Sequence, residues 1–183
     1  MTEDSNRRCS RGERTMVLAD RFAQVFRDEH RKIRDTLLDL LHAFNARNRT
    51  QIQTLLNGAA AYTGPHFRYE EESLYPALVE IFGQEYIDEL YRAHDRAIGA
   101  AKRLIVLAGK DELGDGDVTE ATKLILGILP HVSDCEGLSI MVEKLPNEKV
   151  QWLLETRDRS LQENLDLIRW AEEIRGRATI PAA

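Results

Sequence analysis

The segment HFRYEEESLYPAL, residues 66–78, places a histidine and a glutamate at helical spacing among apolar side chains. His66 and Glu70 are four residues apart, so they lie one turn apart on the same face of a helix. Leu74 and Leu78 extend that face at further intervals of four residues. Because an amphipathic helix buries its apolar face, this segment is expected to carry an imidazole and a carboxylate into the protein interior.

Apolar residues recur at intervals of three and four on both sides of this segment, which predicts long helices. Pro65 and Pro130 are expected to kink or interrupt two of them, because proline has no amide donor. Short connections favour an all-α fold, an antiparallel up-down four-helix bundle with an additional C-terminal helix. The predicted helical runs cover residues 16–45, 50–83, 84–109, 117–142 and about 147–175.

The 183 residues are typical of one domain with two appendages. Residues 1–15 are charged and hold almost no large apolar side chain, so they predict a flexible N-terminal tail. Residues 16–145 are expected to form the bundle, and residues 146–183 an accessory C-terminal helix and tail.

Composition narrows the class of protein further. The 31 acidic residues outnumber the 25 basic ones, which argues against nucleic acid as a partner. No apolar stretch approaches the roughly 20 residues that a membrane span needs, so no membrane partner is expected. Two cysteines and no recognisable leader favour the reducing cytoplasm over a secreted disulfide framework.

Four of the five histidines fall one per predicted bundle helix, on or beside its apolar face. Buried imidazoles are costly unless their nitrogens are satisfied, and four converging rings cannot easily satisfy one another. A bound metal ion would satisfy them. His42 lies about a third of a turn away from the face of His30, so we expect it at the surface. The four inward-facing candidates are His30, His66, His94 and His131.

A second carboxylate is expected from the segment HVSDCE, residues 131–136. Glu136 follows His131 by five residues, which in an ideal helix swings the side chain by about 140°. Cys135 at a spacing of four and Asp134 at a spacing of three are the alternatives, and we rank Glu136 first, Cys135 second and Asp134 third. Imidazoles combined with carboxylates are typical ligands of non-haem iron.

Together these segments resemble the haemerythrin-like, or HHE cation-binding, domain family over roughly residues 17–145. The resemblance implies a four-helix bundle that holds two iron ions, bridged by two carboxylates and an oxo or hydroxo group. It implies that His30 and His66 bind one iron and that His94 and His131 bind the other. The full set of metal ligands implied is His30, His66, Glu70, His94, His131 and Glu136.

One departure from the family pattern bears on function. Oxygen-carrying haemerythrins have two histidines one turn apart on the third helix, whereas this chain has Leu90 and Ile98 one turn before and after His94. The second iron is therefore expected to keep an open position for a small molecule. Tyr91, one turn before His94, and Tyr69, beside Glu70, could approach this open position, although packing is the more common role of tyrosine.

The open position predicts a di-iron protein that binds or reacts with oxygen, hydrogen peroxide or nitric oxide, including a catalase-like activity. An iron- or oxygen-responsive sensor without turnover is the alternative, with the C-terminal helix as the contact for a protein partner or a dimer. A metal-free helical interaction module is the third hypothesis. We interpret Glu71 and Glu72 as part of a solvated acidic face.

Overall fold

The computed structural model describes residues 17–177, and all regular structure in that range is helical. The prediction of an all-α fold is therefore confirmed, whereas the predicted tail over residues 1–15 lies outside the described residues. The long helices are α1 (Leu18–Asn45), α2 (Arg49–Tyr69), α4 (Gln84–Ala108), α5 (Asp115–Glu136) and α7 (Asn147–Glu163). The shorter elements are η1 (Glu70–Leu74), α3 (Tyr75–Phe82), α6 (Leu138–Met141), η2 (Val142–Lys144), α8 (Leu167–Arg169) and η3 (Trp170–Ile174).

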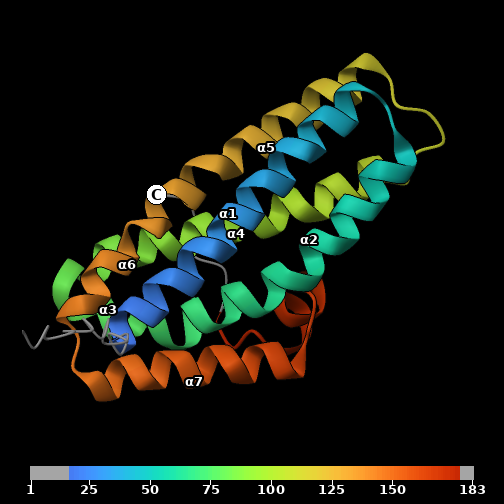
Figure 1. The fold of residues 1–183 in the computed structure, drawn as a ribbon. Helices are drawn as coiled ribbons and strands as arrows, with labels where there is room; N and C mark the ends of the chain where they lie inside the picture. Colours follow the sequence, from blue (N-terminus) through green and yellow to red (C-terminus); the bar gives the residue numbers. More distant parts are fainter. Residues whose placement is uncertain (1–16, 178–183) are drawn as a thin grey trace, which may run out of the picture.

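Four long helices enclose the site described below. Helix α1 packs against α2 and α5, and α4 packs against the same two helices, so each of the four has two neighbours. Figure 1 shows successive members running in opposite directions along one common axis. This arrangement brings residues from four distant parts of the sequence to the same interior.

The apolar face of α1 shows how the helices are held together. Phe22, Phe26 and Leu40 are almost completely buried, and each buried side chain of this size contributes about 1.5–3 kcal/mol. His30 occupies the same face, only 3% exposed, between two apolar clusters. The burial of that face therefore also places the imidazole inside the bundle.

The second predicted run contains a wide π-helical turn instead of a break at Pro65. Helix α2 continues through Pro65, and η1 follows, where the amide of Tyr75 donates to the carbonyl of Glu70 five residues earlier. Pro76 at the start of α3 has no amide to continue the α-helical pattern, which favours the wider turn. In this turn, residues five apart lie on the same face.

Helix α5 likewise runs unbroken through Pro130. By length and composition alone, the stretch Asp115–Lys144 could cross a membrane, with a mean hydropathy of 1.3 in its most apolar window. Here its N-terminal helix, α5, packs against α1 and α4 as a member of the bundle. A bundle helix is thus sufficient to explain its apolar composition.

The predicted fifth helix is interrupted in the structure. Helix α7 ends at Glu163, the following residue Asn164 adopts a left-handed conformation with φ of 47°, and the chain turns back into α8 and η3. Helix α7 lies along α1 and α2, as the lower edge of Figure 1 shows. Trp170 is only 1% exposed and anchors the returning segment in a cluster with Phe67.

Candidate metal centre

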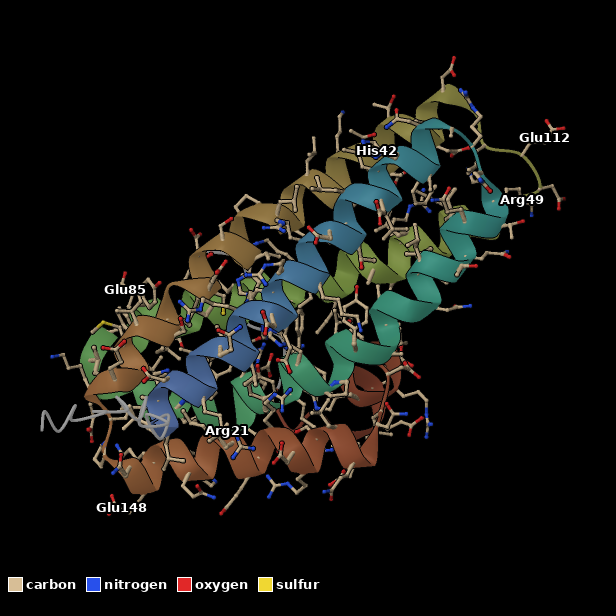
Figure 2. All side chains as sticks on the ribbon, in the orientation of Figure 1. Arg21, His42, Arg49, Glu85, Glu112 and Glu148 are labelled. Atoms are coloured by element: carbon tan, nitrogen blue, oxygen red, sulfur yellow. The ribbon has the colours of Figure 1, made fainter. Side chains whose placement is uncertain are left out.

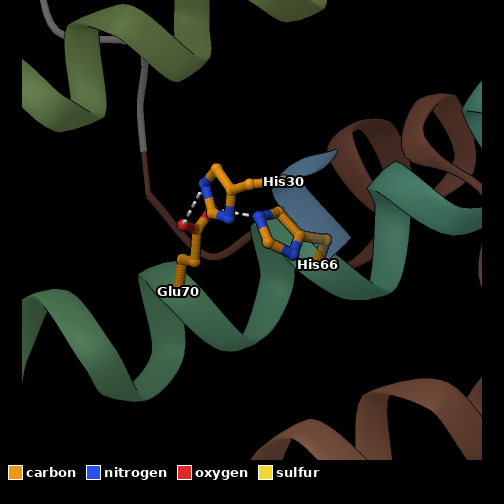
Figure 3. A group of neighbouring side chains, drawn as sticks. All are labelled: His30, His66 and Glu70. Atoms are coloured by element: carbon orange, nitrogen blue, oxygen red, sulfur yellow. Dashed lines mark ion pairs between the residues drawn. The ribbon is translucent and has the colours of Figure 1, made fainter. Parts of the chain in front are cut away.

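The carboxylate of Glu70 lies at the centre of the predicted ligand set and is completely buried. Its Oε1 is 3.9 Å from Nε2 of His30, and its Oε2 is 3.4 Å from Nε2 of His66. The three side chains offer donor atoms that all lie within 4.8 Å of one another, and Figure 3 shows them converging from α1, α2 and η1. Such a group can hold one metal ion.

A second group of donor atoms meets the same carboxylate from the opposite helices. Nε2 of His94 lies 3.1 Å from Oε2 of Glu70, and the thiol of Cys135 donates to Oε1 at 2.9 Å. The phenol oxygen of Tyr75 is 2.9 Å from Nε2 of His94 and 3.4 Å from the sulfur of Cys135. Glu70 therefore joins two sets of potential ligands.

Three imidazoles have their outer nitrogen bound to an oxygen acceptor. Nδ1 of His30 lies 2.9 Å from the carbonyl oxygen of Phe26, and Nδ1 of His66 lies 2.8 Å from Oε2 of Glu29. Nδ1 of His94 lies 3.0 Å from Oε1 of Glu71. When Nδ1–H donates outward, Nε2 is the nitrogen left to bind a metal, as metal-binding histidines usually do.

The interpretation of Glu71 as a solvated side chain was wrong. Glu71 is 9% exposed and forms ion pairs with Arg175 at 2.6 Å and Arg177 at 2.9 Å. These arginines neutralise its charge, so Glu71 can remain inside the protein and hold His94. Glu72, in contrast, is exposed and pairs with Arg68 and Arg159 near the surface.

The fourth histidine and its expected carboxylate partner lie apart. The ring of His131 is 4.9 Å from the ring of His94, nearly perpendicular to it. Cys135, one turn after His131, is buried beside Glu70, whereas Glu136 is partly exposed and its carboxylate makes no hydrogen bond or ion pair within residues 17–177. Because α5 keeps its α-helical form to its end, Cys135, four residues after His131, faces inward, whereas Glu136, five residues after it, does not.

The remaining predictions concern side chains near the centre. His42 is exposed, as expected, and Figure 2 places it in the C-terminal part of α1, toward Arg49 at the start of α2. The phenol of Tyr69 donates to Glu29 at 2.6 Å, and that of Tyr91 donates to the backbone of Glu71 at 3.4 Å. Tyr75, which was not among the predicted site residues, is the tyrosine whose phenol lies beside His94 and Cys135.

The charges of the centre are strongly coupled. Burial opposes ionisation of Glu70, but His66 and His94 hold its pKa well below the usual value. Burial also opposes protonation of His66, yet Glu70 and Glu29 raise its pKa to about 10. Without metal, this carboxylate is thus neutralised by protons on imidazoles, and a cation can take over that role.

Other groups at the centre remain neutral at pH 7. Burial lowers the pKa of His30 to about 4 and the pKa of His131 to about 3. Neutral His30 therefore directs the lone pair of Nε2 at a carboxylate oxygen 3.9 Å away, too far for a hydrogen bond. Burial also raises the pKa of Tyr75 and of Cys135 well above their usual values.

Two hollows border these residues. A cavity of about 70 Å³ is lined largely by apolar side chains and reaches His30, His66, Glu70 and His131. A groove of about 330 Å³ between α4 and α5 is bordered by charged residues and also reaches His131. His131 therefore borders both hollows.

Fold and geometry define a helical protein with a buried histidine and carboxylate cluster suited to a metal cation. The family model of the hemerythrin HHE cation binding domain matches residues 21–138, more than half of the chain. The chain therefore belongs to that family, whose members bind metal cations, typically iron. No match was found among curated proteins or solved structures.

Proposed function

We propose that this chain holds two iron ions around Glu70 and uses them to bind or convert a small oxidant: oxygen, nitric oxide or hydrogen peroxide. One observation carries the proposal. Three imidazoles are oriented through Nδ1 by protein acceptors while their Nε2 atoms face one buried carboxylate. Two of those atoms are 3.1 and 3.4 Å from it, and the third, at 3.9 Å, makes no hydrogen bond to it.

The residues present suit iron. A neutral lone pair at His30 faces an anionic oxygen 3.9 Å away, and a cation about 2.0–2.2 Å from each atom would bind both. Iron supplies the redox chemistry and the attachment of the oxidant. The chain orients the imidazoles through Glu29 and Glu71, and it excludes bulk water by burying the cluster.

The apolar cavity favours oxygen and nitric oxide as ligands. Apolar cavities of about 150 Å³ stay dry and bind apolar molecules as large as benzene. The 70 Å³ cavity beside His30 and His66 is smaller and suits a diatomic molecule. Hydrogen peroxide, which would lose hydrogen bonds there, has the polar groove at His131 as its alternative route.

Iron loading tests this proposal directly. We expect about two iron ions per chain, a visible absorption spectrum, and a spectral change on mixing with oxygen, nitric oxide or peroxide. His30→Ala should lose iron, while His42→Ala, which alters an exposed histidine on the same helix, should not. Oxygen release measured with an electrode detects a catalase-like reaction, in which two peroxide molecules give one oxygen and two waters. Iron-loaded protein that neither binds nor consumes any of these molecules would refute the proposal.

A sensor without turnover is the second candidate, and the contacts of Glu71 favour it. Glu71 contacts His94 on one side and Arg175 and Arg177 on the other, so the metal centre is connected to the C-terminal segment. Helicity and oligomeric state, compared with and without iron, separate the two functions. A large structural response without turnover would favour the sensor, acting on a partner or a second copy in the cytoplasm.

A further inference from the structure

The donor atoms around Glu70 form two chemically different groups. His30 and His66 supply only imidazole nitrogen on one side. On the other side, a phenol and a thiol accompany the imidazole of His94. Tyr75, Cys135 and His94 are all completely buried, so water does not satisfy these polar atoms.

The second group has the spacing of ligands around one ion. Tyr75 Oη lies 2.9 Å from Nε2 of His94 and 3.4 Å from Sγ of Cys135. Oxygens of Glu70 lie 3.1 Å from that nitrogen and 2.9 Å from that sulfur. Ligands bound at about 2.0–2.3 Å to one metal ion lie roughly 3 to 3.5 Å from one another. These are distances between neighbouring donors, and an ion would also have to draw together the donors on opposite sides of the group, because among the described His, Cys, Asp and Glu side chains only His30, His66 and Glu70 already have donor atoms all within 4.8 Å of one another.

The present hydrogen bonds show what such an ion would replace. Glu71 accepts from Nδ1 of His94, so in the neutral ring, the form that binds a metal, the lone pair of Nε2 lies toward the phenol of Tyr75 and the carboxylate of Glu70. The thiol of Cys135 donates to Glu70. Loss of one proton from the phenol and one from the thiol turns both groups into anionic donors that point at a common position.

We propose that the second metal position of this centre is formed by His94, Tyr75, Cys135 and Glu70, and is a phenolate- and thiolate-containing site. This proposal rests on the proposed two-metal centre and specifies the ligands of one half of it. Glu70 is shared with the first position, which has only imidazole and carboxylate ligands. The two anionic ligands stabilise a trivalent ion over a divalent one, so we expect the second position to favour Fe³⁺.

Cobalt provides the test, because a thiolate bound to Co²⁺ gives a near-ultraviolet charge-transfer band that imidazole and carboxylate do not give. We expect this band in the wild-type full chain loaded with Co²⁺. Cys135→Ser should abolish it, and Glu136→Gln, which changes a carboxylate directed away from the cluster, should preserve it. A band that is absent from wild type, or that persists in Cys135→Ser, overturns the proposal.

Tyrosine ligation is tested with ferric iron. A phenolate bound to Fe³⁺ gives a visible charge-transfer band, which Tyr75→Phe should remove and Tyr91→Phe should leave unchanged. The double variant Tyr75→Phe/Cys135→Ser should bind one metal ion instead of two, with circular dichroism as the check on folding. Absence of the phenolate band in wild type overturns the tyrosine assignment, as does its persistence in Tyr75→Phe.

These spectra separate the two proposals. A protein that reacts with oxygen, nitric oxide or peroxide but lacks both charge-transfer bands supports the proposed function and refutes this ligand assignment. A protein that shows both bands but reacts with none of the oxidants supports this ligand assignment and refutes the proposed function.

Discussion

Nδ1 of His94 lies 3.0 Å from the carboxylate of Glu71, and the same carboxylate binds two arginines that follow η3. Arg175 and Arg177 are more than 80 residues away from His94 in sequence. The C-terminal segment thereby helps to fix the orientation of a predicted metal ligand. Asp95 strengthens this connection, because it pairs with both arginines.

Substitution of Glu71 should affect both stability and metal binding. Glu71→Ala leaves Arg175 with Asp95 as its remaining carboxylate partner and leaves Nδ1 of His94 without its acceptor, which should cost about 1–3 kcal/mol of the free energy of unfolding. Glu72→Ala removes an exposed carboxylate one residue away and leaves Arg68 paired with Glu163, so it should cost less than about 1 kcal/mol. Urea denaturation of the metal-free proteins measures both, and equal losses would contradict the assigned role of Glu71.

Glu29 should control the affinity of the first metal position. It binds Nδ1 of His66 at 2.8 Å and is itself held by Arg157 at 2.7 Å. Loss of such an outer partner typically reduces metal affinity by about 10- to 100-fold. We expect that reduction for Glu29→Gln in a competition with a chelator, and no change for Asp28→Asn, which alters an exposed neighbour. Equal affinities of Glu29→Gln and wild type would show that His66 needs no orienting carboxylate.

Metal binding should release protons. The pKa of His66 is raised to about 10 mainly by Glu70 and Glu29 against the effect of burial, so at pH 7 the metal-free imidazole holds a proton that the metal displaces. Since a lower pH favours the protonated form, affinity for Co²⁺ should rise with pH between 6 and 8, by about tenfold per unit for each proton displaced. Calorimetry in buffers with different ionisation enthalpies measures the number of protons released when the metal binds. His42→Ala should release the same number as wild type, and binding without proton release would contradict the prediction.

Spacing along regular helices was sufficient to predict that His30, His66 and Glu70 converge in the interior. His66 and Glu70 are one turn apart in α2, and the apolar face of α1 carries His30 inward, so periodicity alone identified their common location. The same reasoning, applied to HVSDCE, correctly disfavoured a spacing of five but still ranked Glu136 above Cys135. The structure follows the ideal helix there and brings Cys135 to Glu70.

Two features were beyond the reach of ideal spacing. Tyr75 lies five residues after Glu70, which an α-helix would place on different faces, yet the π-helical turn brings both toward His94. Pro76, which lacks an amide to continue the α-helical pattern, is the signal in the sequence for that turn. The role of Glu71 depends on arginines more than 100 residues later in the chain, and no local pattern encodes that contact.

Gly64 permits the C-terminal segment to pack against α2, and its substitution should weaken that packing. A Cβ atom at this position would lie 2.6 Å from the amide nitrogen of Leu167 and would also collide with the backbone of Leu165 and Asp166. Because backbone cannot rotate away as a side chain can, Gly64→Ala should cost at least about 1–3 kcal/mol.

Gly58 is the matched control for this substitution. It lies in the same helix, and a Cβ there meets nothing within 4 Å, so Gly58→Ala should stabilise the helix by roughly 0.5–1 kcal/mol. Thermal unfolding of the two variants measures the difference, and in a Trp152→Phe background the fluorescence of buried Trp170 reports on the returning segment. A Gly64→Ala protein as stable as Gly58→Ala, with unchanged tryptophan emission, would show that α8 does not pack closely on α2. Each substitution adds one methyl group to the same helix, yet the expected changes in stability have opposite signs. The reason is that, of the two glycines, only Gly64 faces the backbone of the returning chain.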